Sequence, residues 1–240
     1  MADIPWQHAV QIVEPYIVRI STPSGSGTGF LFTFFADKSS CAVATAAHVV
    51  AHAHSWQQPI RVQHHSSATE IFLKAEDRAI ILDESLDTAA IVFDIGEFPF
   101  PDTLVGLTET GKYYRQGVEL GWLGYPALSP NNLCFFLGTI SAFLQKEEIY
   151  LVDGVAINGV SGGPAFLTDA SGKLALVGVV SAYVPNRATG ESLPGLLMVS
   201  DVAQLQKVVA TLATMEDAQK KQPSPEDTAQ VEAPDSPSGA

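Results

Sequence analysis

The sequence predicts an all-β protein with two six-stranded β-barrels, a C-terminal helix and a disordered tail. Short aliphatic and aromatic runs recur along most of the chain, and clusters of turn-forming residues separate them. Such spacing is typical of barrels and sandwiches. The 240 residues are enough for two barrels that share one site, so the length requires no second functional unit.

The first barrel is expected over about residues 12–97. Its first strand ends near Ile20, because Thr22–Gly25 is a turn-rich cluster. Further short apolar runs predict the other strands, at residues 30–35, 41–46, 60–63, 71–75, 79–82 and 89–93. Phe98–Pro101 cannot lie inside a central strand, since proline lacks the N–H that a strand ladder needs. This segment is therefore the expected linker between the barrels.

The second barrel is expected over about residues 113–200, with a hairpin turn at Asp169–Lys173. Its predicted strands cover residues 118–124, 135–143, 148–152, 164–167, 174–184 and 195–199. Ser200 is a suitable N-cap for a helix over residues 201–214. Apolar side chains recur at helical spacing and give this helix one apolar stripe, formed by Val202, Leu205, Val208, Val209 and Leu212.

From Glu216 the composition shifts to Pro, Ser, Glu, Asp, Gln and Ala, with almost no large apolar side chain. A segment of this kind cannot bury enough apolar surface to offset the entropy lost on ordering. Residues 216–240 are therefore expected to form a disordered acidic tail, and residues 1–215 a folded domain.

Composition and charge exclude some classes of partner. Hydrophobic residues make up 46% of the chain and charged residues 16%, which allows a large core. No apolar run approaches the ~20 residues that cross a bilayer, so no membrane partner is expected. The formal net charge of −13 argues against binding to nucleic acid or to an anionic membrane, since both favour Lys and Arg.

One glycine-rich stretch, Gly159–Pro164, carries the strongest chemical signal. It places Ser161 between glycines, which tolerate the positive φ of a tight backbone turn behind a hydroxyl. A serine hydroxyl becomes a good nucleophile only when a base removes its proton, so a histidine and an orienting carboxylate are required. Upstream, His48 follows an apolar run and Asp87 precedes a run of small and aliphatic residues. The chain order is His, Asp, Ser.

These three residues, their flanks and their order resemble the chymotrypsin-fold serine peptidases, and more closely the bacterial HtrA/Deg-type peptidase domain. The resemblance covers most of the chain, and further short motifs match at Gly25–Phe30, Gly124–Pro126, Gly138–Ala142 and Gly178–Ser181. It implies a chymotrypsin-like double barrel and a serine endopeptidase that acts on protein or peptide substrates without cofactor or metal. HtrA-type proteins usually continue into a peptide-binding PDZ domain, which this sequence does not contain.

The resemblance also implies a role for each site residue. Ser161 is the expected nucleophile, His48 the base that takes and returns its proton, and Asp87 the carboxylate that orients the histidine ring. The N–H groups of Gly159 and Ser161 are expected to form the oxyanion hole. The carboxylates Asp83, Glu84 and Asp94 are rejected as the third member, because they lack the flanking sequence of Asp87.

The substrate pocket is expected to take a modest uncharged side chain. The resemblance places its walls at Val155 and Ala156, upstream of the nucleophile, and along the strand that contains Ser181, Ala182 and Tyr183. No aspartate stands where trypsin-like peptidases have theirs. The nearest acid in the sequence is Asp153.

Regulation by N-terminal cleavage is not expected. Zymogen-type members of this fold have an aspartate before the nucleophile that pairs with a freed amine, and this chain has Val160 there. HtrA-type enzymes order the oxyanion loop through neighbouring loops, and Ala127–Cys134 is the corresponding segment rich in Pro, Ser and Asn. We therefore expect activity to depend on the ordering of residues 127–134, by substrate or by self-association, with the oligomeric state left open.

The N-terminus and the cysteines predict a cytoplasmic protein. Met1–His8 has neither the basic nor the apolar region of a secretory signal. Extracellular peptidases of this fold commonly carry several disulfides, which the two cysteines, Cys41 and Cys134, cannot supply. This cysteine content favours a reducing compartment.

Other interpretations of the same residues stay open at this point. A Gly-Ser-Gly sequence also occurs in plain turns, so the chain could be an inactive binding or scaffold module of the same fold, or an esterase. Several histidines lie close together in the sequence, which also suggests a zinc site. No carboxylate or cysteine nearby completes a ligand set, so no metal is expected. These histidines are His48, His52, His54, His64 and His65.

Overall fold

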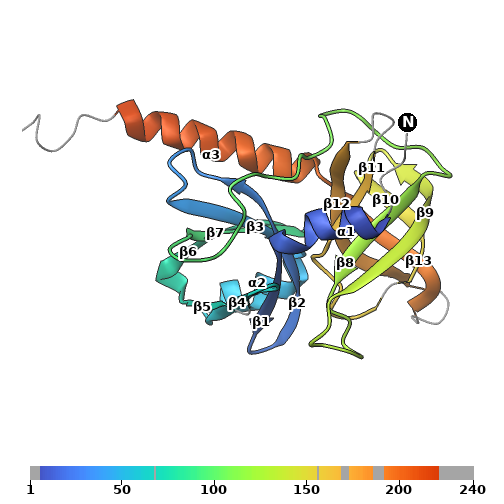
Figure 1. The fold of residues 1–240 in the computed structure, drawn as a ribbon, viewed down its shortest axis with the longest axis horizontal. Helices are drawn as coiled ribbons and strands as arrows, with labels where there is room; N and C mark the ends of the chain where they lie inside the picture. Colours follow the sequence, from blue (N-terminus) through green and yellow to red (C-terminus); the bar gives the residue numbers. More distant parts are fainter. Residues whose placement is uncertain (1–5, 68, 156, 169–172, 186–191, 222–240) are drawn as a thin grey trace, which may run out of the picture.

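The computed structural model describes residues 6–67, 69–155, 157–168, 173–185 and 192–221. Two β-units lie side by side, and the C-terminal helix α3 (Ala203–Lys221) extends from the second unit over the first (Figure 1). Strands predominate in both units, so the predicted all-β class is confirmed.

The first unit is a curled antiparallel sheet. Within the described residues it has seven strands in the order β5-β4-β1-β2-β3-β7-β6, and the two edge strands do not pair. The strands are β1 (Ile17–Thr22), β2 (Gly25–Phe34), β3 (Ser40–Thr45), β4 (Ile60–His64), β5 (Glu70–Leu73), β6 (Arg78–Asp83) and β7 (Thr88–Asp94). This unit thus differs from the predicted six-stranded barrel, although each predicted run overlaps a strand.

The edge strands β5 and β6 stay apart because a short 3₁₀-helix, η2 (Ala75–Asp77), connects them instead of a hairpin turn. The Arg78 side chain lies at this gap, where its guanidinium donates hydrogen bonds to the carbonyl oxygens of Leu73 and Gln58. These carbonyls are therefore satisfied without a strand ladder that closes the sheet.

The second unit is a closed barrel, as predicted. Among the described residues its six strands follow the order β10-β13-β12-β11-β8-β9. They are β8 (Glu119–Gly124), β9 (Cys134–Leu144), β10 (Ile149–Asp153), β11 (Pro164–Thr168), β12 (Leu174–Pro185) and β13 (Ser192–Asp201). Trp122 and Tyr150 are fully buried in its core. The predicted hairpin at 169–173 lies almost entirely outside the described residues.

Two helices near the N-terminus were not predicted. Helix α1 (Trp6–Val13) leads through η1 (Glu14–Tyr16) into β1. The Trp6 ring lies 5.5 Å from the Phe135 ring and 6.0 Å from the Phe166 ring, so α1 packs on the second unit before the chain enters the first. Helix α2 (Ala47–Ser55) follows β3 directly.

Helix α3 is longer than the predicted segment 201–214. It continues to Lys221, because the residues after Leu212 are mostly good helix formers and proline first occurs at position 223. The Glu216 carboxylate also accepts a hydrogen bond of 2.7 Å from the Ala36 N–H of the first unit. Residues 216–221 are therefore helix rather than tail, and the rest of the predicted tail lies outside the described residues. No described helix is both long and apolar enough to span a membrane.

Candidate active site

His48 lies in the first turn of α2, immediately after β3. Strand β3 pairs with β7 so that Thr45 is opposite Ala89, which brings the residue before β7, Asp87, beside the start of α2. The Ala47 N–H donates a hydrogen bond of 3.1 Å to the Asp87 carbonyl oxygen. Strand pairing in the first unit thus places the predicted histidine and aspartate side by side.

The side chains of His48 and Asp87 form a direct hydrogen-bonded pair. The ring Nδ1 lies 2.8 Å from Oδ2 and 3.0 Å from Oδ1, and the His48 backbone N–H donates to Oδ1 at 3.0 Å. When Nδ1 carries the proton that faces the carboxylate, the neutral ring has its free acceptor at Nε2. The pair therefore fixes the tautomer that a general base needs.

Ser181 is the third group at this carboxylate. Its hydroxyl is almost fully buried and donates a hydrogen bond of 2.7 Å to Asp87 Oδ2. Burial raises the pKa of the Asp87 carboxyl, but the hydrogen bonds from His48 and Ser181 outweigh it and hold the pKa below its usual value. Sequence reasoning assigned Ser181 to the substrate pocket, whereas its side chain contacts Asp87. The available signal was a polar residue inside an apolar strand.

Ser161 lies in the loop before β11, close to Thr28 of β2 and to the end of β3. Its carbonyl oxygen accepts a hydrogen bond of 2.8 Å from the Thr28 N–H, and the next residue, Gly162, donates to the Val180 carbonyl at 2.6 Å. Gly162 has φ +87°, and a Cβ there would collide with the Thr28 carbonyl oxygen and the Thr45 hydroxyl. Only glycine allows this close approach.

The approach of Gly162 to Thr45, which is three residues before His48, places the Ser161 loop beside the start of α2. Among the described residues, no hydrogen bond joins the Ser161 hydroxyl to the His48 ring. Hydrogen bonds of catalytic groups often tighten only when substrate binds.

The loop at Gly159 presents backbone N–H groups. Gly159 has φ +90°, and the carbonyl before it, that of Asn158, accepts a hydrogen bond of 2.7 Å from the Ala127 N–H. In a trans peptide the N–H points opposite to the carbonyl, so the Gly159 N–H is directed away from Ala127. No carbonyl oxygen of a described residue accepts from the N–H of Gly159 or Ser161.

The predicted substrate pocket is only partly described. Val155 follows β10 and is 52% exposed, and Asp153 is exposed at the end of that strand. Ala182 and Tyr183 belong to β12, but their side chains are outside the described part, and so is Ala156. The prediction of pocket walls at these positions stays a prediction.

The remaining histidines do not gather around a common point. His52 and His54 are exposed on α2, whereas the buried His64 bonds through Nε2 to the Pro15 carbonyl at 2.9 Å. Helix α2 carries His52 and His54, whereas His64 ends β4 and His65 follows it in a turn. Among the described residues, no group of three or more His, Cys, Asp or Glu side chains is placed to hold a metal ion.

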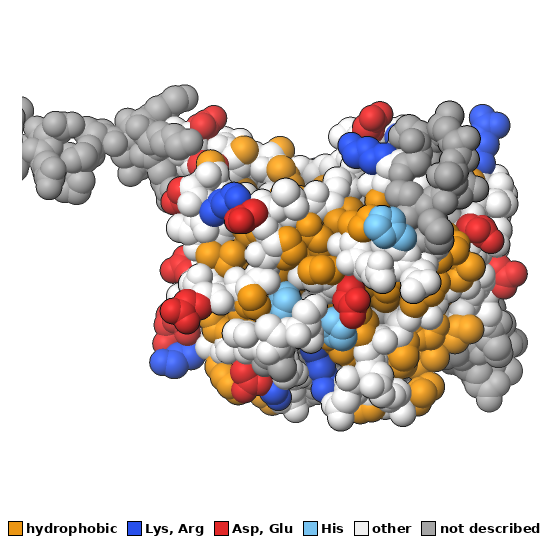
Figure 2. Space-filling view, viewed as in Figure 1, with side chains coloured by type: hydrophobic (Ala, Val, Ile, Leu, Met, Phe, Trp, Pro, Cys, Tyr) orange, Lys and Arg blue, Asp and Glu red, His pale blue; other side chains and the backbone are white. Residues whose placement is uncertain are grey.

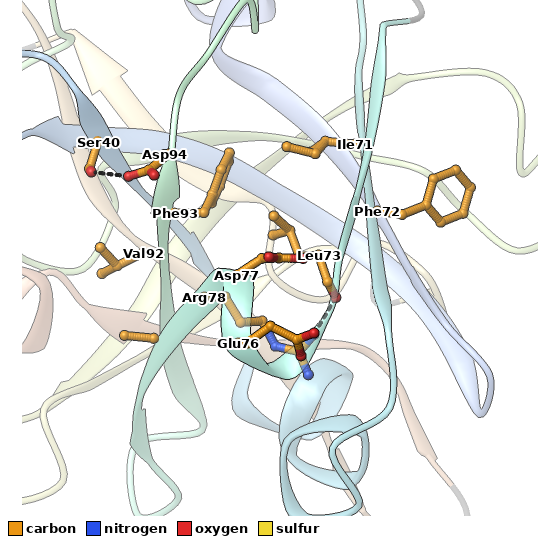
Figure 3. Close-up of a pocket in the computed structure, with 11 residues that line it drawn as sticks. Ser40, Ile71, Phe72, Leu73, Glu76, Asp77, Arg78, Val92, Phe93 and Asp94 are labelled. Carbon is orange, nitrogen blue, oxygen red and sulfur yellow. Dashed lines mark hydrogen bonds between the residues drawn. The ribbon is translucent and has the colours of Figure 1, made fainter.

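A cleft of about 590 Å³ lies away from this site, at the open side of the first sheet (Figure 3). It is lined by residues of β5, η2, β6 and β7, and its polar groups are already paired in part: Ser40 donates to Asp94 at 2.7 Å. The Phe72 ring points away from the other labelled side chains (Figure 3). The lining contains no histidine beside a nucleophile, so the chemistry of this cleft differs from that of the Ser161 site.

Comparison with solved structures identifies the fold. Deg5 is similar with a TM-score of 0.61 and 19% identity over 84% of this chain and 90% of that chain. A serine endoprotease from Yersinia pestis is similar with a TM-score of 0.63 and 18% identity, over 88% of this chain and 68% of that chain. The Rv3671c protease of M. tuberculosis H37Rv, in an inactive form, is similar with a TM-score of 0.58 and 21% identity, over 88% of this chain and 98% of that chain.

No protein-family model and no curated protein matches the sequence. At these identities the likeness to the solved structures establishes the fold, which is chymotrypsin-like. The resemblance to the HtrA/Deg-type peptidase domain is confirmed at the level of the fold.

Proposed function

We propose that this chain is a serine endopeptidase that cleaves peptide bonds through an acyl-enzyme at Ser161. The observation that carries the proposal is the hydrogen-bonded pair of His48 and Asp87, which Ser181 also holds. The Ser161 loop packs against Thr45, three residues before His48, and presents backbone N–H groups. A plain structural turn at Ser161 would need none of these partners. The solved serine proteases with the same fold support the reaction class.

In the first half of the reaction, His48 Nε2 takes the Ser161 hydroxyl proton as Oγ attacks the peptide carbonyl carbon. The oxyanion that forms accepts hydrogen bonds from the N–H groups of Gly159 and Ser161. Asp87 stabilises the imidazolium, which then gives its proton to the leaving amine. In the second half, His48 takes a proton from water as the water attacks the acyl-enzyme, and returns it to Ser161 as the carboxylic acid leaves.

The proposed substrates are proteins or peptides with a modest uncharged side chain before the scissile bond. Val155 supports this preference, since it is apolar and stands where trypsin-like peptidases have an aspartate. The mechanism requires no metal and no cofactor. A reducing compartment such as the cytoplasm is part of the proposal, because Cys41 and Cys134 are both free thiols.

The deciding experiment is labelling with a fluorophosphonate, a reagent that reacts with activated serines. The wild type should be labelled and should cleave a peptide library, whereas Ser161→Ala and His48→Ala should do neither. The double variant should lose no more activity than either single variant, because the residues act as one unit. Ser66→Ala, at an exposed serine outside the site, is the matched control.

An unlabelled wild type that is folded would favour the inactive binding module. Labelling with cleavage of esters but not of peptides would favour the esterase. A peptide profile dominated by Arg or Lys before the cleaved bond would contradict the proposed pocket.

A further inference from the structure

One hydroxyl in the first unit bonds to two segments of the second unit, the Gly159 loop and the residue that follows β8. Thr28 lies in β2 and is fully buried. Its Oγ1 donates a hydrogen bond of 2.9 Å to the Gly159 carbonyl and accepts one of 3.0 Å from the Tyr125 N–H. Its backbone N–H also donates to the Ser161 carbonyl at 2.8 Å.

The residue type matters at this position. The Tyr125 N–H is a donor and the Gly159 carbonyl an acceptor, and the two residues are 97 and 131 positions from Thr28 in the sequence. A single buried group can satisfy both only if it accepts and donates at once, which a hydroxyl does and an aliphatic side chain cannot. Valine has nearly the same shape as threonine and would leave both backbone groups unpaired.

These bonds act on the peptide groups around Gly159. The Gly159–Val160 peptide is fixed by Thr28 Oγ1, and the Asn158–Gly159 peptide, which contains the Gly159 N–H, is fixed by Ala127. Ala127 is two residues after Tyr125, the second partner of the same hydroxyl. Glycine resists rotation less than any other residue, so the direction of the Gly159 N–H depends on these external bonds.

We propose that Thr28 is a positioning residue that holds the Gly159 loop in the conformation that receives the oxyanion. The inference rests on the proposed function, because it concerns the same reaction. Thr28 acts through Gly159 and Tyr125 and does not touch the substrate.

The test compares Thr28→Val, which removes the hydroxyl at nearly constant shape, with Thr28→Ser, which keeps it. Thr33→Val is the matched control. Thr33 is a buried residue of the same strand, and its hydroxyl donates to the carbonyl of its neighbour Phe34. We expect Thr28→Val to lower kcat by about ten- to a hundredfold, since loss of one oxyanion donor lowers it about 10²–10³-fold. KM should change by less than about threefold, and Thr28→Ser should restore kcat.

A peptide boronate, which forms a tetrahedral adduct on the nucleophile, gives a second readout. Its affinity should fall with kcat in Thr28→Val and stay unchanged in Thr33→Val. Equal kcat and equal boronate affinity in Thr28→Val and the wild type would overturn the proposal. If neither Thr28→Val nor Thr28→Ala folds while Thr28→Ser does, the hydroxyl is a folding element and the positioning role is also wrong.

The outcome for the proposed function is separate. A wild type that no fluorophosphonate labels contradicts the peptidase itself. A labelled wild type with an unaffected Thr28→Val contradicts only the role of Thr28.

Discussion

Asp87 has a left-handed backbone conformation, with φ +50°, which is uncommon for residues other than glycine. Residues in this region cost of order 1–3 kcal/mol and persist when the surrounding structure determines them strongly. Here the Ala47 N–H holds the Asp87 carbonyl, and both His48 and Ser181 hold its carboxylate. The strain lies at the residue that orients the proposed base.

Ser181→Ala should weaken catalysis without abolishing it. A hydrogen bond to a charged group contributes about 1.5–3 kcal/mol, so the lower limit corresponds to about a tenfold fall in kcat/KM. A value equal to that of the wild type would show that Ser181 does not orient Asp87.

The same variant has a pH signature in stability. Because the pKa of Asp87 is lowered in the folded protein, its carboxylate stabilises the fold above its unfolded pKa of about 3.9. That stabilisation is lost as the pH falls through the folded pKa. The free energy of unfolding of Ser181→Ala should therefore be below that of the wild type at neutral pH, and the gap should narrow below about pH 4. Urea titrations at both pH values measure the gap.

At the scale of the element, helix α3 is held by one face. Val202, Leu205, Val208 and Leu212 are buried in a hydrophobic cluster formed by residues of both units, whereas Met215 is 56% exposed. In Figure 1 the helix leaves the second unit and lies along the first. It therefore connects the two units by packing as well as by chain continuity.

Leu205→Ala should lower the free energy of unfolding by about 2–5 kcal/mol, the range for truncating a buried leucine. Met215→Ala, on the exposed face of the same helix, should change it by less than about 0.5 kcal/mol. Denaturant titrations of both variants are the measurement. If both variants changed the free energy of unfolding by equally small amounts, α3 would not pack on the rest of the protein in solution.

Asp201, just before α3, should make the stability of the folded protein depend on pH. Its carboxylate accepts a hydrogen bond of 2.8 Å from the Ala203 N–H. Burial nevertheless raises its pKa to about 6. The folded protein thus holds this proton more tightly than the unfolded chain, and stability should fall as the pH rises from about 4 to about 6.

Asp201→Asn should remove that slope, since asparagine keeps a capping oxygen without the charge. About two pKa units correspond to about 3 kcal/mol, so above pH 6 the variant should be more stable by up to that amount. Melting temperatures at pH 4 and pH 7 test it. If the melting temperatures of the wild type and of Asp201→Asn changed with pH in the same way, Asp201 would not be the cause of the pH dependence.

At the scale of the whole molecule, the proposed site exists only where the two units meet. The first unit supplies His48, Asp87 and Thr28, and the second supplies Ser161 and Ser181.

On the face shown in Figure 2, histidine side chains lie near the middle among apolar ones, and acidic side chains are scattered over the surface. The net charge of −13 is therefore not gathered into one patch on this face.

The segment 127–134 connects the units beside the Gly159 loop. Ala127 holds Asn158, and the Asn131 side chain accepts a hydrogen bond of 3.2 Å from Arg19 of β1. Val160, the residue before the nucleophile, is buried in the barrel core and cannot pair with an amine. These contacts agree with a loop that is ordered by its neighbours.

Deleting residues 129–132 should therefore lower kcat at least about tenfold, because Ala127 would lose its fixed position. An uncleavable extension before Met1 should leave kcat unchanged. Peptide turnover of both proteins, with melting temperatures as a folding control, checks the pair. If the extension abolished peptide turnover and the deletion left it unchanged, the segment 127–134 would not control activity and the N-terminus would.

The strands of both units could be predicted from the amino-acid sequence, which also carries the proposal of the three triad residues. Apolar runs and turn clusters are local signals, and the glycines around Ser161 reflect a local backbone need, so both can be seen without a structure. Helices α1 and α2 were not predicted, since helices of 8 and 9 residues are stable only through the surface that they cover.

The closure of each unit and the polar partners of the candidate site depend on contacts between residues that are far apart in the chain. The first sheet stays open where η2 connects β5 to β6, and the Arg78 guanidinium bonds to the Leu73 carbonyl there; sequence spacing does not show where such a long side chain will lie. Ser181 and Thr28 find their partners 94 and 131 residues away in the sequence. A buried hydroxyl has no periodic signal, because its place is set by whichever distant backbone or carboxylate group would otherwise be unpaired.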